Sequence, residues 1–535
     1  MKEVLIVGSG ASGVHFALSL LRKNYRVVMV DIGNRKPAPV RPDADFVALR
    51  EMEDPAGYFL GGKYEALILP GNDGEYYGFP PNKQYIFAEP RTFAHQARGF
   101  SPLFSFAAGG LAEAWTGGCY PFHDGDLEGF PFDYGRLGPC YSEVARRIGI
   151  SGAEDDLARF FPVHEGLMDP LELDEHSGVF LQNYARHRRE LNEKLRFYIG
   201  RARLATLSRN WNGRPKCDYS GRCLWGCPAG SLYTPSLTLE ECRRYPNFHY
   251  ENNLSVSHFC YNSAGDVTRL VAYSTRDQQR RDFPVSRLAL AAGALCSSKI
   301  FLESIYRDTG TIATLPGLMD NRQVLMPFVN LRMLGHAYNP RSYQYHQIAI
   351  GMEGESPKDY VHGLVTTLKT AMIHPVVQSL PFDLGTSVAL FRNLHAALGL
   401  VNINFSDWRR EENYVSLDPH PRPGESRLVI HYAPEAGEEK KIKRATKTFQ
   451  RGLRKLSCVA PGAMLHRRPM GASVHYAGTI PMLESGSSFT CTPSGQSRDF
   501  RNLYLVDGTT FPALPAKNLT FSLMANAVRI AEEAF

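Results

Sequence analysis

The apolar positions at the start of the chain predict a strand, a helix and a second strand. Val4–Val7 is a continuous apolar run, which is typical of a buried strand. From Val14 to Leu21 the apolar residues recur at the spacing of one helix face, and Val27–Val30 is a second apolar run that ends at Asp31. The pattern therefore predicts a βαβ unit near the N-terminus.

The turn between the first strand and the helix reads GSGASG over residues 8–13. In a dinucleotide-binding βαβ unit, Gly8 would permit the tight turn, Gly10 would let the backbone approach a pyrophosphate, and Gly13 would allow close helix packing. Asp31 would bind the ribose hydroxyls. Glycine-rich turns occur in many α/β proteins, but here strand, helix and acidic residue follow in the required order. The motif predicts a dinucleotide site and does not distinguish FAD from NAD.

The C-terminal part of the chain predicts a further strand and a long helix. Residues 502–508, NLYLVDG, read as a strand that closes in a turn, and a helix with an apolar face is expected from about Asn518 to the end of the chain. The N-terminus of such a helix offers unpaired amides and partial positive charge. This end of the helix would suit an anionic group such as a reduced flavin.

The middle of the chain predicts two further strands and an amphipathic helix. Residues 398–405 and 426–432 read as strands bounded by Asp, Pro and Gly turn residues. Apolar residues recur at helical spacing from Ile442 to Leu456. The lysines and arginines between them are therefore expected on the solvent face of that helix, and a basic patch for an anionic partner is the less favoured interpretation.

Composition and charge exclude several classes of protein. The chain has 535 residues, of which 43% are hydrophobic, enough for a large folded core. Its formal net charge of +6 is too dilute over this length to indicate a nucleic-acid partner. We expect no signal peptide and no transmembrane segment. These features favour a cytoplasmic protein with reduced thiols, and export on a partner's signal stays open.

Five segments along the chain carry a family resemblance. They are the GSGASG turn with Asp31, GGLAEAWTGG at residues 109–118, the strand and AAGA turn at residues 288–294, HYAGT from His475, and NLYLVDGTTFP followed by Asn518. In this order they resemble the glucose-methanol-choline (GMC) family of FAD-dependent oxidoreductases, nearest the sugar dehydrogenase and pyranose oxidase branch. The resemblance implies an α/β Rossmann-like FAD-binding domain with a discontinuous, antiparallel-sheet (α+β) substrate domain.

The resemblance also implies how the two domains are interleaved along the chain. The FAD-binding domain would comprise residues 1–130, residues 200–312 with the Cys-rich loop, and residues 464–535 with the catalytic His and Asn. Residues 131–199 and 313–463 would form the substrate domain, with the strands at 398–405 and 426–432 in an antiparallel sheet over the flavin.

His475 and Asn518 are the catalytic residues that the resemblance implies. Oxidation of an alcohol by a flavin requires a base for the hydroxyl proton, and the ordinary pKa of histidine, about 6.5, suits this task. His475 would accept the proton, and Asn518 would hold and polarise the substrate oxygen. The competing interpretations are a structural histidine and a helix N-cap. Leu519 follows Asn518 where the family commonly has proline, which puts the detailed geometry of this residue in doubt.

The flavin contacts are implied by position. Ala114 stands where pyranose oxidases carry a histidine bonded covalently to the flavin, so we expect non-covalent FAD. Val256 matches the position whose backbone meets adenine, and an ordinary buried valine is the competing interpretation. The implied cofactor-binding residues are Gly8, Gly10, Ala11, Ser12, Gly13, Asp31, Gly109, Gly110, Trp115, Thr116, Val256, Ala292, Gly293, Asp507, Gly508 and Leu519.

Three of the ten cysteines, Cys217, Cys223 and Cys227, fall within eleven residues. Their spacing disfavours a zinc ribbon, which needs two CxxC pairs. The same spacing occurs in bacterial FAD-dependent sugar dehydrogenases of the GMC family, where the thiolates hold a 3Fe-4S cluster. A Cys-rich loop without metal is the competing interpretation, because free cysteines are common buried residues.

The expected function is oxidation of a secondary alcohol of a sugar or sugar-like polyol to a ketone, with hydride transfer to flavin N5. An acceptor other than oxygen is favoured if the cluster exists; otherwise a protein, a quinone or oxygen stays open. The alternatives are an oxygen-using alcohol oxidase on a non-sugar alcohol, a lyase on the same scaffold, and a non-catalytic flavin-binding subunit. The presence of both His475 and Asn518 counts against the last.

Overall fold

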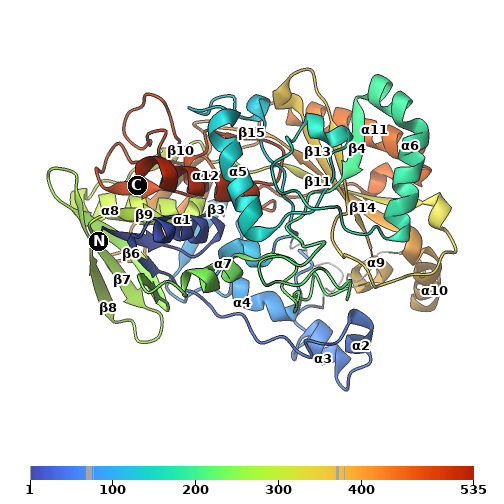
Figure 1. The fold of residues 1–535 in the computed structure, drawn as a ribbon, viewed down its shortest axis with the longest axis horizontal. Helices are drawn as coiled ribbons and strands as arrows, with labels where there is room; N and C mark the ends of the chain where they lie inside the picture. The colour runs from blue at the N-terminus through green and yellow to red at the C-terminus, as the bar shows by residue number, and fades with distance from the viewer. Residues whose placement is uncertain (1, 68–74, 76, 369–372, 379) are drawn as a thin grey trace.

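The computed structural model describes residues 2–67, 75, 77–368, 373–378 and 380–535. Figure 1 shows an elongated molecule with both termini at one end. Helices α6 and α11 lie at the other end, and α5 lies between the two ends of the molecule. No helix in these ranges is long and apolar enough to cross a membrane.

A five-stranded parallel sheet forms the first part of the molecule. Its strands are ordered β20-β9-β1-β2-β5, and all four neighbouring pairs are parallel. The strands are β1 (Glu3–Val7), β2 (Arg26–Val30), β5 (Phe248–Glu251), β9 (Leu288–Leu290) and β20 (Leu503–Leu505). Helix α1 (Ala11–Arg22) connects β1 to β2, which confirms the predicted βαβ unit. The α/β class expected from the sequence is also confirmed.

The two faces of this sheet are covered by different elements, and alternate residues of β1 face each of them. Val4 and Ile6 pack with α1, α7 (Pro235–Cys242) and α12 (Thr520–Ala534). Leu5 and Val7 face a second core. That core contains a three-stranded antiparallel sheet, β6 (Leu254–Tyr261), β7 (Val267–Ser274) and β8 (Arg280–Pro284), together with helix α8 (Ala294–Thr309).

A seven-stranded antiparallel sheet forms the second part of the molecule. Six strands are ordered β18-β11-β14-β13-β12-β4, and β19 also pairs with β11. The strands are β4 (Phe197–Arg201), β11 (Gln323–Asn330), β12 (Ile348–Met352), β13 (Val361–Thr367), β14 (Leu398–Phe405), β18 (Cys458–Val459) and β19 (His466–Arg467). Helices α6 (Glu175–Leu195) and α11 (Glu438–Lys455) pack on one face of it. Helix α11 buries its apolar stripe as its spacing predicts.

The strand predicted at residues 426–432 lies in a sheet other than the expected one. Residues 398–405 form β14 of the seven-stranded sheet, but β17 (Arg427–His431) belongs to a four-stranded sheet of order β10-β16-β17-β3. Leu428 and Ile430 pack into the same core as Leu5 and Val7, which explains the difference. The other strands are β3 (Ala94–Arg98), β10 (Thr314–Pro316) and β16 (Tyr414–Asp418). The exact domain boundaries stay a prediction.

The remaining elements are short, apart from α5, which packs against α12. They are α2 (Phe46–Arg50), α3 (Pro55–Leu60), α4 (Gln84–Phe87), α5 (Tyr134–Ile148), α9 (His374–Gln378), α10 (Leu384–Leu394), β15 (Asp407–Trp408) and β21 (Ala513–Leu514). The pair β15 and β21 joins the start of the segment after β14 to the segment just before α12.

Candidate active site

A large cavity lies at the carboxyl ends of the parallel strands. Its empty space, including the part open to solvent, is about 1530 Å³. The residues that follow β1, β2, β9 and β20 line it, as expected for a ligand site of an open parallel sheet. Of the residues that the sequence implies for the cofactor, the cavity is lined by Gly8, Gly10, Ala11, Ser12, Asp31, Gly110, Val256, Ala292, Gly293, Asp507, Gly508 and Leu519.

The glycines of the first turn have distinct surroundings. Gly8 has a φ of +98°, and a Cβ atom there would lie 2.6 Å from Ala291 O. A Cβ on Gly13 would lie 2.1 Å from Gly8 O, so the start of α1 packs closely on the turn. A Cβ on Gly10 would meet only Ala291 O, at 4.0 Å, and Gly10 lines the cavity. These surroundings agree with the three roles that the motif predicts.

The start of α1 suits an anionic group. No side chain caps this helix, and its first turn contains no acidic residue. The unpaired amides of a helix N-terminus can therefore bind phosphate oxygens at this wall of the cavity. The size of the cavity, the close backbone at Gly10 and this uncapped helix together fit an FAD-type dinucleotide.

Asp31 is held by a small hydrogen-bond network at the end of β2. The Ser9 hydroxyl and the Tyr250 hydroxyl both donate to Oδ2 of Asp31, the latter at 3.1 Å, and the Ser9 amide adds a bond of 3.2 Å. Burial raises the pKa of Asp31 to about 6, although these hydrogen bonds oppose the shift. Ser9 also accepts from the amide of Gly109 at 3.1 Å. Gly109 thus supports the cavity from behind and does not line it.

Asp507 joins two turns at the floor of the cavity. Its Oδ2 accepts from the Gly293 amide at 2.9 Å and from the Ser297 hydroxyl at 2.5 Å. Its Oδ1 accepts from the amide and the hydroxyl of Thr509, at 3.0 and 2.8 Å. Burial raises the pKa of this carboxyl. Asp507 therefore fixes the turn before α8 against the turn after β20.

Some implied cofactor residues lie beside the cavity, and other lining residues carry no sequence signal. Trp115 donates its indole NH to Tyr233 O at 2.7 Å, and the carbonyl of Thr116 accepts from Tyr343 at 3.0 Å. Neither lines the cavity, and nor do Gly13 and Gly109. A polar group that was not predicted also lines the cavity, and it consists of Ser257, Cys296, Lys299 and Glu303. Cys296, Lys299 and Glu303 recur at helical spacing along α8, and this spacing was the sequence signal that could have placed them on one face.

His475 lies between two residues that line the cavity, Val474 and Tyr476. Its ring is buried, with 9% of the residue exposed, and its Nδ1 lies 2.8 Å from Asn321 Oδ1. Burial lowers the pKa of His475 to about 4, and the charge of Arg468 adds to this shift. The ring is therefore neutral at physiological pH.

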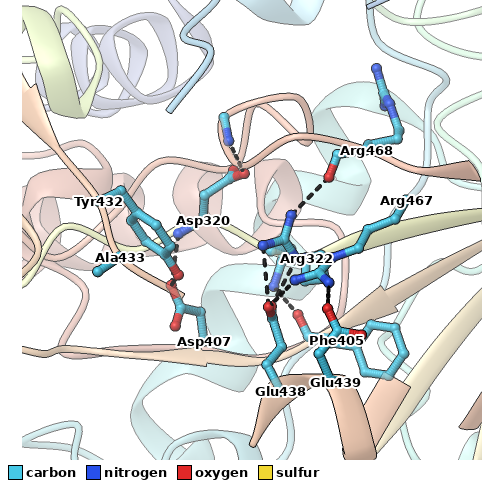
Figure 2. A network of polar contacts seen from close by, with 12 residues as sticks. Asp320, Arg322, Phe405, Asp407, Tyr432, Ala433, Glu438, Glu439, Arg467 and Arg468 are labelled. Atoms are coloured by element: carbon cyan, nitrogen blue, oxygen red, sulfur yellow. Dashed lines mark hydrogen bonds and ion pairs between the residues drawn. The ribbon is translucent and has the colours of Figure 1, made fainter. Parts of the chain in front are cut away.

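The backbone that carries His475 is clamped by Asp320. This buried carboxylate accepts from the amides of Gly471 (2.7 Å) and His475 (3.1 Å) and from the Ser473 hydroxyl. The Asp320 amide donates to Asp407 at 3.0 Å. Figure 2 shows Asp320 beside Asp407 and Tyr432, and next to them the ion pair of Arg322 with Glu438. Burial raises the pKa of Asp320 to about 6.

Asn518 lies immediately before α12 and does not cap it. The N-cap position is Leu519, and no side chain provides a cap, so the N-cap interpretation of Asn518 is wrong. Its Oδ1 atom is buried without a hydrogen-bond partner in the described part of the chain. The preceding residue anchors it, because the buried ammonium of Lys517 binds Asp126, Phe160 O and, at 3.2 Å, Pro121 O.

Further buried polar atoms without partners lie near Asn518 and His475. Within the described ranges they include the hydroxyl of Tyr120 and Nε2 of both His346 and His362. The rings of Tyr120 and His362 lie against each other, with centroids 4.4 Å apart. Tyr120 and Asn518 both lie next to Gly118, because a Cβ atom built on Gly118 would be 3.1 Å from the Tyr120 ring and 3.2 Å from Asn518 Oδ1. Burial lowers the pKa of His362, and the nearby positive charge of Lys517 lowers it further. Such orphaned atoms are unfavourable unless a ligand or water satisfies them.

Among the described residues, Cys217, Cys223 and Cys227 are not arranged as a metal site. Across the described residues, no group of three His, Cys, Asp or Glu side chains could hold a metal ion. Burial raises the pKa of the Cys217 thiol to about 12, and the nearby Cys227 adds to the shift. Lys83 is also buried in this region, and its pKa falls to about 8. The arrangement does not fit an iron-sulfur cluster.

The fold and the cavity define a class of protein, a dinucleotide-binding oxidoreductase with a second sheet beside the cofactor site. Residues 409–527 match the family model of the GMC oxidoreductases. This match covers the C-terminal part of the chain, and together with the two relatives described below it indicates an oxidoreductase of alcohols. The family and the fit of the cavity together indicate FAD as the cofactor.

Two curated relatives match along almost the whole chain. A C-glycoside 3-oxidase from Microbacterium trichothecenolyticum is 24% identical, with 98% of this chain and 95% of the relative covered. A paromamine 6'-oxidase from Streptomyces fradiae is 21% identical, with 99% and 90% covered.

Solved structures show the same fold at low sequence identity. A pyridoxine 4-oxidase from Mesorbium loti superposes with a TM-score of 0.61 at 14% identity, and 100% of this chain and 99% of that chain are covered. A formate oxidase from Aspergillus oryzae superposes with a TM-score of 0.63 at 11% identity, with 99% and 98% covered.

Proposed function

We propose that this protein oxidises a secondary alcohol of a sugar or sugar-like polyol to a ketone, with His475 as the base. The observation that carries the proposal is a neutral, buried imidazole between two residues of the cavity wall. FAD bound in the cavity would accept the hydride at N5. A base within reach of the substrate hydroxyl is the remaining requirement, and His475 would take that proton at Nε2.

Asn518 would bind the reacting oxygen by donating from its side-chain NH2 group, and its Oδ1 would accept from another substrate hydroxyl, because the proton of the reacting hydroxyl goes to His475. Its Oδ1 atom has lost water without gaining a protein partner in the described structure, and Leu519 beside it lines the cavity. The neighbouring orphaned atoms of Tyr120, His346 and His362 support a substrate with several hydroxyl groups, because each buried atom needs a hydrogen-bond partner. The relatives support a glycoside-like substrate by name, since one is a C-glycoside 3-oxidase.

We further propose how the chain holds FAD and passes electrons on. The pyrophosphate would lie at Gly10 and the start of α1, the ribose at Asp31, the adenine at Val256, and the flavin near Gly110 and Gly508. Ala114 supports a non-covalent flavin. The poor fit of the cysteines to a cluster supports an acceptor that receives electrons from the flavin directly, as the names of the two oxidase relatives also suggest.

Anaerobic reduction of the purified yellow protein by a panel of sugars and polyols tests this function. We expect bleaching of the flavin spectrum by at least one glycoside or polyol. The variant His475→Asn should lose about 10²–10⁴-fold in the rate of bleaching while it still binds FAD. His176→Asn is the matched control, because this buried histidine packs against Phe328 on the side of the seven-stranded sheet that carries α6.

Three results would count against the proposal. If no compound of a broad panel bleaches the flavin, the proposed dehydrogenase or oxidase activity is refuted. Turnover of a substrate without bleaching would favour a lyase. Protein that lacks bound FAD and cannot be loaded with it would undermine the whole assignment. Stoichiometric iron in anaerobically purified protein would restore the cluster hypothesis.

A further inference from the structure

The side-chain amide of Asn321 has an orientation that its surroundings fix. Asn321 precedes β11 and is buried, with 1% of the residue exposed. Its Nδ2 donates to two backbone carbonyls, Phe405 O at 2.8 Å and Pro515 O at 3.0 Å. Its Oδ1 lies 2.8 Å from Nδ1 of His475. A reversed amide would place its oxygen against two carbonyl oxygens, so Oδ1 must face the histidine.

This orientation determines which nitrogen of His475 carries the proton. An amide oxygen can only accept a hydrogen bond, so Nδ1 of His475 must be the donor. A neutral imidazole has a single ring proton, and the low pKa of this buried ring keeps it neutral. Nε2 therefore holds an unprotonated lone pair.

Asn321 is attached to rigid parts of the fold. Phe405 ends β14 of the seven-stranded sheet, and Pro515 follows β21 just before Lys517 and Asn518. The neighbouring Asp320 holds the amide of His475 at 3.1 Å. Two consecutive residues thus fix His475, one through its ring and the other through its backbone.

We propose that Asn321 is a positioning residue that holds His475 in the Nδ1–H tautomer, so that Nε2 is ready to accept a proton. The catalytic use of that lone pair rests on the proposed function. The tautomer itself follows from the contacts of Asn321 and can be measured without any substrate.

The test is a ¹⁵N NMR spectrum of the FAD-loaded enzyme labelled at the histidine rings, since the shifts of the two nitrogens distinguish the tautomers. His475→Gln identifies the signals of His475 by difference. In the native protein we expect a protonated Nδ1 and an unprotonated Nε2. In Asn321→Leu, which removes the acceptor, we expect the Nε2–H form to become populated.

Asn183→Leu is the matched control. Asn183 is also buried and donates its amide to a backbone carbonyl, Leu456 O, at 3.0 Å, but it lies on α6. This variant should lose similar packing and one similar hydrogen bond and keep the native tautomer of His475. A change of tautomer in the control as large as that in Asn321→Leu would overturn the proposal.

Kinetics give the second readout. Asn321→Leu should lower the rate of flavin reduction at saturating substrate by about 10²–10⁴-fold, with KM changed much less. The control Asn183→Leu should change neither this rate nor KM, because Asn183 lies on α6, away from His475. A loss of rate in Asn183→Leu as large as that in Asn321→Leu would contradict a role through the hydrogen bond to His475.

The outcomes separate this proposal from the proposed function. A native His475 with its proton on Nε2 overturns the assignment of Asn321, whether or not Asn321→Leu folds. A native Nδ1–H tautomer in a protein that oxidises no alcohol leaves the assignment of Asn321 standing and refutes only the proposed reaction.

Discussion

Replacement of Lys517 by methionine should destabilise the protein far more than loss of an ordinary ion pair. The Lys517 side chain is fully buried, and its ammonium binds the Asp126 carboxylate and two backbone carbonyls. The Asp126 side chain is 2% exposed. Burial lowers the pKa of Lys517, and the nearby Asp126 opposes that shift, so the two charges depend on each other.

The magnitude follows from what the substitution leaves behind. Methionine fills much of the same volume, so the cavity term is small. Asp126 would keep the hydrogen bond from the His123 backbone amide but lose its countercharge in a buried site. Removal of one partner of a buried pair costs about 3–5 kcal/mol. An added Asp126→Asn removes the unpaired charge and should recover part of that loss.

Urea denaturation of the FAD-loaded enzyme measures the change in the free energy of unfolding. Lys23→Met is the matched control, because Lys23 pairs with Glu532 at the surface, where the two side chains are 29% and 53% exposed. We expect the control to change stability by less than about 1 kcal/mol. The reasoning would be refuted if Lys517→Met cost no more than Lys23→Met, or if Asp126→Asn made Lys517→Met worse.

Three further results are expected. Burial raises the folded-state pKa of Asp320 to about 6 from 3.8, so its contribution is present at low pH and lost as pH rises through 6. Native stability relative to Asp320→Asn, measured by urea denaturation, should thus fall by about 2 kcal/mol between pH 4 and pH 7. Gly10→Ala should fold but bind FAD weakly in a fluorescence titration. Gly8→Ala should fold poorly, because the added Cβ atom would lie 2.6 Å from the backbone oxygen of Ala291. Cys217→Ser should keep FAD content and the rate of bleaching, since the described residues bring no metal-binding group together at this thiol.

Each of these has a result that would contradict it. A pH-independent difference between the native protein and Asp320→Asn would mean that the carboxyl has an ordinary pKa. Full FAD affinity in Gly10→Ala would place the pyrophosphate elsewhere. Loss of iron together with activity in Cys217→Ser would show that the thiols hold a cluster. Gly62→Ala, where an added Cβ meets no atom within 4 Å, is the control for the glycine variants.

The local patterns of the sequence were good predictors of the local structure. The βαβ unit, the amphipathic helix α11 and the C-terminal helix each depend on residues a few positions apart, so periodicity alone reveals them. The sheet to which a strand belongs depends on distant partners. Residues 427–431 alternate as a strand should, but the choice between two sheets depends on whether Leu428 and Ile430 meet the core beneath β1 or the core of the seven-stranded sheet.

The same distinction separates the parts of the site that the sequence could and could not predict. The glycine turn and Asp31 were predictable because one short segment contains the whole arrangement. Asn321 was not, because its three partners lie at Phe405, Pro515 and His475, each more than 80 positions away. Asp and Asn are common turn residues, so the Asp320-Asn321 dipeptide gives no sign of these contacts. The competing interpretation of Asn518 as a helix cap is wrong, because a cap depends on the position where the helix begins, one of the least predictable features.

The hydrogen bonds of the buried polar groups divide the candidate site into two kinds of residue. In the first kind, the polar side-chain atoms have hydrogen-bond or charge partners in the protein, so the fold holds these residues in place without a ligand. They are Asp320, Asn321 and Lys517. Tyr120 and Asn518 each keep a buried polar atom that no described residue satisfies. A satisfied group gains nothing from substrate, whereas an orphaned group gains about 1–3 kcal/mol when a hydroxyl completes it. The first kind can therefore orient the base, and only the second kind can contribute to binding and selectivity.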